Sequence, residues 1–214
     1  MEGTIRKAEP RDAVEMAKLY YMAGRSHVEL SIHDLIIPGP PGMTDERIGT
    51  LAKVIAAETV SWMSYVYYKV VEVDGKVASG RATFTVEQYD DRQVGGALME
   101  AGWQVKDLME LVKRLEVWEA TDTGRVPDYL IVEHVATFEE FRGRGYTGAL
   151  LERAGDEAAR AGLKGLQLTV LLGNEPAIRV YEKAGFRMDI TKENPDFERL
   201  FAAPGVGRML LDLG

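Results

Sequence analysis

Residues 138–154 read FEEFRGRGYTGALLERA and join an apolar, strand-like run to a helix-like run. Where the strand has ended and the helix begins, the chain carries three glycines, Gly143, Gly145 and Gly148. Small residues let backbone N–H groups approach an anion closely, and a helix N-terminus carries partial positive charge. Arg142 and Arg144 add two guanidinium groups beside the same turn. This stretch therefore predicts a binding site for a phosphate or pyrophosphate group.

The same residues match G-x-G-x-x-G, the fingerprint of a dinucleotide-binding fold. That fingerprint requires an acidic residue about twenty positions further on, at the end of the next strand. The next strand-like run, LQLTVLLG at residues 166–173, contains none, and the remaining chain is too short for a doubly wound sheet. The sequence also lacks a G-x-x-x-x-G-K-[ST] loop. We therefore expect a pyrophosphate site in a smaller mixed α/β fold.

The pattern around this stretch alternates strands with helices. Residues 163–172 form a nearly continuous apolar run, which is typical of a strand buried on both faces. Asp74-Gly75 marks the turn of a hairpin. Apolar periodicity predicts strands at residues 4–8, 65–73, 77–86, 129–137, 163–172, 186–190 and 207–213, and helices at 13–24, 27–36, 45–60, 146–161 and 174–184.

Residues 88–127 form a helical insertion in an otherwise single domain that spans residues 1–214. An apolar stripe predicts one long amphipathic helix there, with Leu98, Ala101, Val105, Leu108, Val112 and Leu115 at alternating steps of three and four. Such a stripe usually packs on its own domain. The alternatives are a lid over the substrate or a seam between two copies in a homodimer.

Two motifs together resemble the GNAT superfamily of N-acetyltransferases. Motif A of that family, R-x-x-G-x-[GA], aligns with residues 142–147, and a later motif, N-x-x-A-x-x-x-Y-x-x-x-G-F, aligns with residues 174–186. Their order and separation are also those of the family. The chain departs from motif A at Thr147, where the family has Gly or Ala. The resemblance implies a mixed, mostly antiparallel sheet flanked by helices, which opens between two adjacent parallel strands to hold acetyl-CoA.

Carried over residue by residue, the resemblance assigns the pantetheine arm of acetyl-CoA to the strand at residues 135–137. The pyrophosphate falls to the turn at residues 142–148, and Asn174 contacts the cofactor from a helix start. Asn174 is also a good N-cap, with Pro176 just inside the helix. The cofactor-binding residues so implied are Val135, Ala136, Thr137, Arg142, Gly143, Arg144, Gly145, Tyr146, Thr147, Gly148 and Asn174.

The reaction requires an acid and a base. Tyr181 resembles the family's general acid, and a phenol with a pKa of about 10 can donate a proton at neutral pH. Family members carry their base, Glu or His, on the strand at residues 129–137. Strand alternation puts Glu133 on the same face as Ile131 and Val135, so we expect Glu133 to be the base. The same alternation turns His134 the other way, as a structural residue.

Composition limits the remaining possibilities. The chain has no cysteine, which excludes disulfides and thiolate metal sites and suits a reducing compartment. Its histidines have no metal-ligand spacing, so we predict no metal. A net charge of −8 disfavours binding to nucleic acid. Without an apolar run of about 18 residues or a signal peptide, we expect a cytoplasmic protein that does not enter a membrane.

These observations predict an acetyl-CoA-dependent N-acetyltransferase in which a primary amine attacks the thioester directly. The acceptor is a small molecule or a peptide; polyamine, amino acid, aminoglycoside, peptide N-terminus and protein lysine all fit the sequence. In the family, the segment at residues 26–34 shapes the acceptor pocket. An acyl chain longer than acetyl is a second possibility. The alternative from another class is a non-catalytic acyl-CoA-binding or regulatory module on the same fold.

Overall fold

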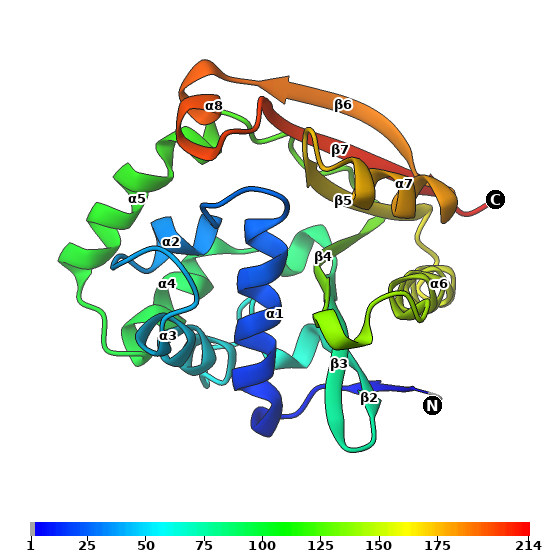
Figure 1. The fold of residues 1–214 in the computed structure, drawn as a ribbon, viewed down its shortest axis with the longest axis horizontal. Coiled ribbons are helices and arrows are strands. Elements are labelled where there is room, and N and C mark those ends of the chain that lie inside the picture. The colour runs from blue at the N-terminus through cyan, green and yellow to red at the C-terminus, as the bar shows by residue number, and fades with distance from the viewer. Residues whose placement is uncertain (1–2) are drawn as a thin grey trace.

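The computed structural model describes residues 3–214, which form a seven-stranded sheet in the order β1-β2-β3-β4-β5-β7-β6 (Figure 1). Neighbouring strands are antiparallel except β4 and β5, which are parallel. The strands are β1 (Thr4–Lys7), β2 (Tyr68–Val73), β3 (Lys76–Phe84), β4 (Tyr129–Thr137), β5 (Gly165–Leu171), β6 (Arg187–Glu193) and β7 (Gly205–Asp212).

Helices cover both faces of this sheet. Helices α1 to α5 lie on one side of β3 and β4, and α6 lies on the other side (Figure 1). The helices are α1 (Ala13–Arg25), α2 (Ile32–Ile36), α3 (Asp45–Ile55), α4 (Asp91–Glu100), α5 (Val105–Glu119), α6 (Tyr146–Arg160), α7 (Glu175–Lys183) and α8 (Pro195–Phe201). Single 3₁₀ turns occur at Pro10–Asp12, Tyr65–Tyr67, Val86–Gln88 and Glu139–Phe141.

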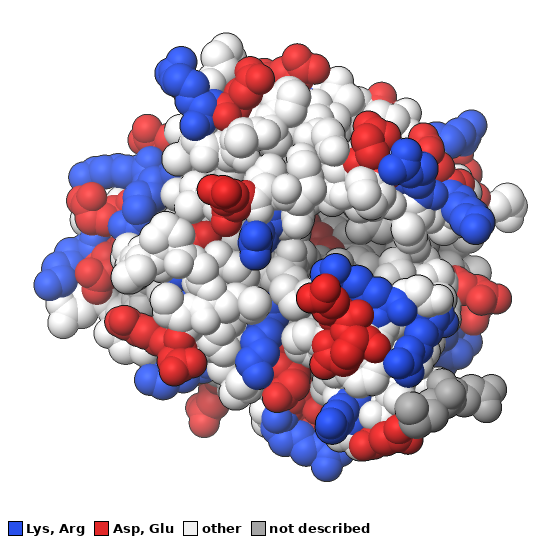
Figure 2. All heavy atoms as spheres, viewed as in Figure 1, with Lys and Arg blue, Asp and Glu red and all other residues white. Residues whose placement is uncertain are grey.

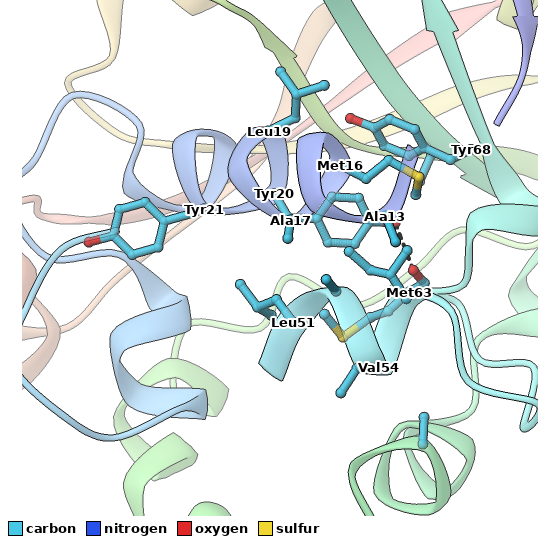
Figure 3. Close-up of a cluster of buried hydrophobic side chains, with 14 of the residues drawn as sticks. Ala13, Met16, Ala17, Leu19, Tyr20, Tyr21, Leu51, Val54, Met63 and Tyr68 are labelled. Carbon is cyan, nitrogen blue, oxygen red and sulfur yellow. Dashed lines mark hydrogen bonds between the residues drawn. The ribbon is translucent and has the colours of Figure 1, made fainter. Parts of the chain in front are cut away.

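The largest core lies between α1, α3 and the sheet. Figure 3 shows Met16 and Tyr20 of α1 between α3 and Tyr68 of β2, and all three side chains are fully buried. The Tyr20 hydroxyl donates a hydrogen bond of 3.0 Å to the backbone carbonyl of Met63. Burial of these large side chains contributes roughly 2–3 kcal/mol each, which fixes α1 against the sheet.

The sheet opens between its two parallel strands. β4 and β5 pair only at their beginnings, where Tyr129, Leu130 and Ile131 face Gly165, Leu166 and Gln167. Beyond this point the later part of β4 keeps β3 as its only strand partner, and β5 continues beside β7. The predicted fold, a mixed and mostly antiparallel sheet that opens between two parallel strands, is therefore confirmed.

A buried arginine connects α6 to β3. The Arg81 side chain is fully buried, and its Nε donates to the carbonyl oxygen of Leu150 at 2.9 Å. Its Nη1 donates to Thr83 Oγ1 at 2.7 Å, and its Nη2 lies 2.9 Å from Glu157 Oε2. Because Leu150 and Glu157 belong to α6, the Arg81 side chain links that helix to β3.

Arg81→Met is expected to lower the free energy of unfolding by about 3 kcal/mol, because it leaves the carbonyl oxygen of Leu150 without its buried donor and removes one of the cations that pair with Glu157. Denaturant titration followed by circular dichroism measures this change. Arg187→Met is the control, because Arg187 pairs with Asp212 at the surface, where its side chain is 78% exposed. Such surface pairs contribute about 0–1 kcal/mol. Equal losses in the two variants would contradict the role of Arg81.

Several local predictions from the sequence are wrong. Residues 88–127 contain two helices, α4 and α5, with Gly102 at a φ of +107° between them, in place of one long helix. The apolar stripe is accordingly divided: Leu98 is buried, but Val105 and Val112 are 61% and 67% exposed. Residues 27–31 and 56–60 are not helical, and residues 65–67 form a 3₁₀ turn where a strand was predicted to begin. Helix α8, which follows β6, was not predicted.

Candidate active site

A cleft of about 1350 Å³ lies where β4 and β5 diverge. In the view of Figure 1, the molecular surface is hollowed at this place (Figure 2). The cleft brings together every site residue that was predicted from the sequence. These are Glu133, Val135, Ala136, Thr137, Arg142, Gly143, Arg144, Gly145, Tyr146, Thr147, Gly148, Asn174 and Tyr181.

The turn from β4 into α6 is open toward the cleft. Gly143 and Gly145 have φ angles of +74° and +79°, which L side chains rarely adopt. α6 begins at Gly145 without a side-chain cap, although the first amides of a helix have no acceptor within it. A Cβ placed on Gly145 or Gly148 would meet nothing within 4 Å. The turn therefore leaves room for an anionic group beside the helix N-terminus.

Arg142 and Arg144 lie exposed on either side of Gly143. Arg142 Nε donates to the carbonyl oxygen of Thr137 at 3.4 Å, and Arg144 Nη2 donates to that of Glu140 at 3.1 Å. Neither guanidinium forms an ion pair within the part of the chain that the structure describes. Both positive charges therefore remain available to a phosphate.

The departure from motif A at Thr147 has a structural consequence. The Thr147 hydroxyl lies 3.3 Å from that of Thr137, which lies 2.8 Å from the Ser79 hydroxyl. This chain of hydroxyls links the end of β4 to the start of α6 and to β3. The Tyr146 side chain, in contrast, packs against Leu150 in a separate buried cluster. Tyr146 thus contributes packing beneath the turn.

A β-bulge in β4 changes which side chains face the cleft. The register between β3 and β4 shifts where Ala82 faces Glu133 and Gly80 faces Ala136. His134 has a φ of +52° within this bulge. The alternation predicted from the sequence fails here: Ile131 packs in the core beside α1, whereas Val135 packs in the cluster on the α6 side. Val135 therefore does not share the face of Ile131.

His134 likewise does not turn away from Glu133. Its ring stacks on Tyr20 of α1 with 3.9 Å between ring centroids, and its Nδ1 lies 3.9 Å from Glu133 Oε2. Trp62 and His33 follow at 5.7 Å each. Burial lowers the pKa of His134 well below its usual value, so the imidazole is neutral at physiological pH. The bulge thus places both residues on the α1 side of β4.

Glu133 is a carboxyl group of the cleft whose pKa lies near neutral pH. Its side chain is 20% exposed, and no described residue donates a hydrogen bond to it. Burial raises the pKa of Glu133 to about 7; the charge of Arg125 opposes this shift, and those of Asp91 and Asp122 add to it. A carboxyl group with a pKa near 7 can both accept and release a proton at neutral pH.

Tyr181 and Asn174 come from α7 and from the residue before it. Asn174 is the N-cap of α7, as predicted, because its Oδ1 accepts from the backbone N–H of Ala177 at 3.2 Å. Tyr181 packs edge-on against Phe186, with centroids 6.0 Å apart. Burial raises the pKa of Tyr181 to about 12, so its hydroxyl keeps its proton at neutral pH.

The cleft also contains residues that the sequence did not identify individually. Ser26, His27 and Ile32, from the segment at residues 26–34, line it. Trp118, at the end of α5, lines it as well and was missed. A lone Trp at helical spacing gives no signal beyond core packing. Among residues 3–214, no group of His, Asp and Glu is arranged to hold a metal ion, and no helix could cross a membrane.

Comparison with known proteins identifies the family. Residues 56–186, more than half of the chain, match the model of the acetyltransferase (GNAT) family. No curated protein is significantly similar to the chain in sequence. An N-acetyltransferase from Staphylococcus aureus Mu50 superposes with a TM-score of 0.71 at 22% identity, covering 97% of this chain and 100% of its own.

Two further structures have the same fold. A protein described only as an acetyltransferase has a TM-score of 0.67 at 18% identity, with 99% of this chain and 100% of its own covered. The ribosomal-protein-S18-alanine N-acetyltransferase of Escherichia coli has a TM-score of 0.51 at 19% identity, over 100% of this chain and 95% of its own. At these identities the structures support the fold alone, whereas the family model covers both motifs around the cleft up to Phe186. The chain therefore belongs to the GNAT family of acetyltransferases.

Proposed function

We propose that this protein transfers an acetyl group from acetyl-CoA to a primary amine. One observation carries the proposal: a single cleft contains an open, positively charged turn at the α6 N-terminus, a carboxyl group with a pKa near 7, and a partly buried, protonated phenol. The turn suits a pyrophosphate, the carboxyl group suits an ammonium group, and the phenol suits a departing thiolate.

In the proposed reaction, Glu133 takes a proton from the amine, directly or through water. Deprotonation matters because an alkylamine with a pKa of about 10.4 is almost fully protonated at pH 7. The amine nitrogen attacks the thioester carbon, a C–N bond forms and the C–S bond breaks, and the nitrogen loses its second proton to water, from which Tyr181 is afterwards reprotonated. Backbone N–H groups of residues 135–137 stabilise the oxyanion, and Tyr181 donates its proton to the sulfur of CoA.

The experiment that tests the function has two parts. Calorimetry with CoA measures binding, and release of the free thiol from acetyl-CoA measures turnover with a panel of amines: a polyamine, free amino acids, an aminoglycoside, a peptide N-terminus and a peptide lysine. Binding with turnover supports the proposal. Binding without turnover on any acceptor would leave a non-catalytic acyl-CoA-binding module. Faster turnover with a longer acyl-CoA would reassign the acyl group.

Arg142→Gln is expected to weaken CoA binding about tenfold, because a charge-assisted hydrogen bond to phosphate contributes about 1.5–3 kcal/mol and this side chain is exposed. The loss should shrink as salt is raised, since salt screens exposed charges. Arg160→Gln, an exposed change at the other end of α6, is the control and should bind CoA normally. A loss in Arg142→Gln that does not depend on salt would contradict an electrostatic role.

A further inference from the structure

Asn174 and Ser26 meet across the cleft, although they are 148 residues apart in the chain. The Asn174 side chain is oriented by its capping bond, because only its oxygen can accept from the N–H of Ala177. Its Nδ2 must then point away from α7, and it donates to Ser26 Oγ at 2.5 Å. The bond joins the C-terminal end of α1 to the N-terminal end of α7.

Ser26 holds this position at a conformational cost. Its φ of +57° and ψ of −122° lie in a region that glycine adopts and L side chains rarely do. Glycine would fit the backbone better, so what the serine adds is its hydroxyl. That hydroxyl accepts the hydrogen bond from Asn174 and lies 3.4 Å from Nδ1 of His27.

A second contact joins the same two segments. The His27 ring lies over Gly173, where a Cβ would come 3.1 Å from His27 Nε2. Gly173 also has a φ of +91°, so a side chain there is disfavoured twice. We call the residues Ser26, His27, Gly173 and Asn174 the clasp. Two segments on opposite sides of the cleft are therefore held by a hydrogen bond and by van der Waals contact.

Helix α7 has little else to fix its N-terminal end. None of its nine residues is fully buried, and all of them are described by the structure. Ala177 and Tyr181 pack only partly against the core on the α6 side. Tyr181 follows Asn174 by seven residues, which is about two helical turns, so both lie on the same side of the helix. A shift of Asn174 would therefore also move the Tyr181 hydroxyl.

We propose that Ser26 is a positioning residue, which through the clasp sets Asn174 and α7 over acyl-CoA bound in the cleft. This inference rests on the proposed function, because that function supplies the ligand. A primary amide has two N–H donors. Ser26 takes one of them, and the other remains for a carbonyl oxygen of the bound cofactor.

Ser26→Gly tests the proposal, because it removes the hydroxyl and relieves the backbone at the same time. We expect the affinity for CoA, measured by calorimetry, to fall about fivefold to tenfold, which corresponds to one lost hydrogen bond. We also expect kcat with acetyl-CoA to fall, since Tyr181 is less well placed. The melting temperature should stay the same or rise. A merely structural role for Ser26 would not weaken CoA binding in a variant that is equally or more stable.

Three further variants separate the hydroxyl from other effects. Ser26→Ala lacks the hydroxyl but keeps the strain, so it should bind CoA as weakly as Ser26→Gly while melting lower. Asn174→Ala and Asn194→Ala each remove a helix N-cap, since Asn194 caps α8 through its own side chain. Both should melt lower, but only Asn174→Ala should lose affinity for CoA.

The outcomes distinguish the two proposals. If the unchanged protein binds CoA and Ser26→Gly binds it equally well, the clasp is refuted and the proposed function stands. If Ser26→Ala alone loses affinity, backbone strain and not the hydroxyl is responsible, which also refutes the clasp. If the unchanged protein gives no heat with CoA, the proposed function fails and the clasp fails with it.

Discussion

Glu133→Gln should lower kcat/KM for acyl transfer by about 10²–10⁴-fold at pH 8, the usual contribution of a general base. Glutamine has nearly the shape of glutamate but cannot accept the proton of an ammonium group. Initial rates of CoA thiol release at limiting amine measure the change. CoA binding should be nearly unaffected, because the predicted phosphate contacts lie in the turn at residues 142–148.

The pH profile gives a sharper test of the same variant. Burial raises the pKa of Glu133 to about 7, and only the ionised carboxylate can act as a base. In the unchanged protein, kcat/KM should therefore rise tenfold per pH unit below about 7 and level off above it, because the amine enters as an ammonium ion until the pH nears its own pKa of about 10.4. Glu133→Gln should lack the break near pH 7. Glu193→Gln, an exposed change on strand β6, is the control and should keep it.

Stability separates loss of chemistry from loss of folding. The pKa of Glu133 is higher in the folded protein than its ordinary value of 4.5, so between these values the folded state binds the proton more tightly. This group's stabilising effect is complete below about pH 4.5 and is lost as the pH rises through 7. Glu133→Gln should therefore be more stable than the unchanged protein above pH 8, although less active. If the kcat/KM profile of Glu133→Gln kept its break near pH 7, the group that titrates there would not be Glu133.

The sequence predicted the glycine turn, the N-cap and the strand that line the cleft because their determinants are local. The glycines at 143 and 145, the N-cap at Asn174 and the strand at residues 129–137 each depend on a few neighbouring residues. Positive φ angles and a capping amide are properties of residue types, which a motif records directly. The position of the cleft can be predicted once a parallel pair of strands is expected beside that turn.

The bulge in β4 could not be predicted, because it belongs to the pairing of β4 with another strand, β3. The register shifts at Gly80 and Ala82 of β3, where a Cβ on Gly80 would come 2.3 Å from the ring of Tyr68. Nothing in the run YLIVEHVAT indicates that shift, so strict alternation was the natural expectation. The error concerned His134 and Val135. Glu133 was placed correctly beside Ile131 because both precede the bulge.

The part of the cleft formed by the ends of α1 and α5 depends on contacts between distant segments and was predicted least well. Ser26 and Trp118 approach the cleft from α1 and α5, which are far apart in the sequence. Gly102 lies between α4 and α5, inside the apolar periodicity that predicted one long helix. A single glycine within such a pattern is often tolerated, so it did not indicate a break. Tertiary packing determines where the second helix begins, and this determines that Trp118 reaches the cleft.

Tyr181→Phe should lower kcat about 100-fold, at the lower end of the range for general acids. The thiol of CoA is a fairly good leaving group, since thiols have a pKa of about 8.5. Expelling an unprotonated thiolate beside the partly buried ring at position 181 is nevertheless costly, because an anion without a hydrogen-bond donor is poorly solvated there. Rates at saturating acetyl-CoA and amine measure the effect. KM for acetyl-CoA should change little.

The variant should fold normally, because phenylalanine keeps the ring that packs against Phe186. Burial raises the pKa of Tyr181 to about 12, so the donor stays protonated throughout the assay range. Its titration should therefore cause no fall in kcat below about pH 10 in the unchanged protein. Tyr65→Phe, a change outside the cleft, is the control and should leave kcat unchanged. If Tyr181→Phe also kept full kcat, the proton on sulfur would have to come from water. Tyr181 would then serve only to pack α7 against the core, and the chemical step would depend on Glu133 alone.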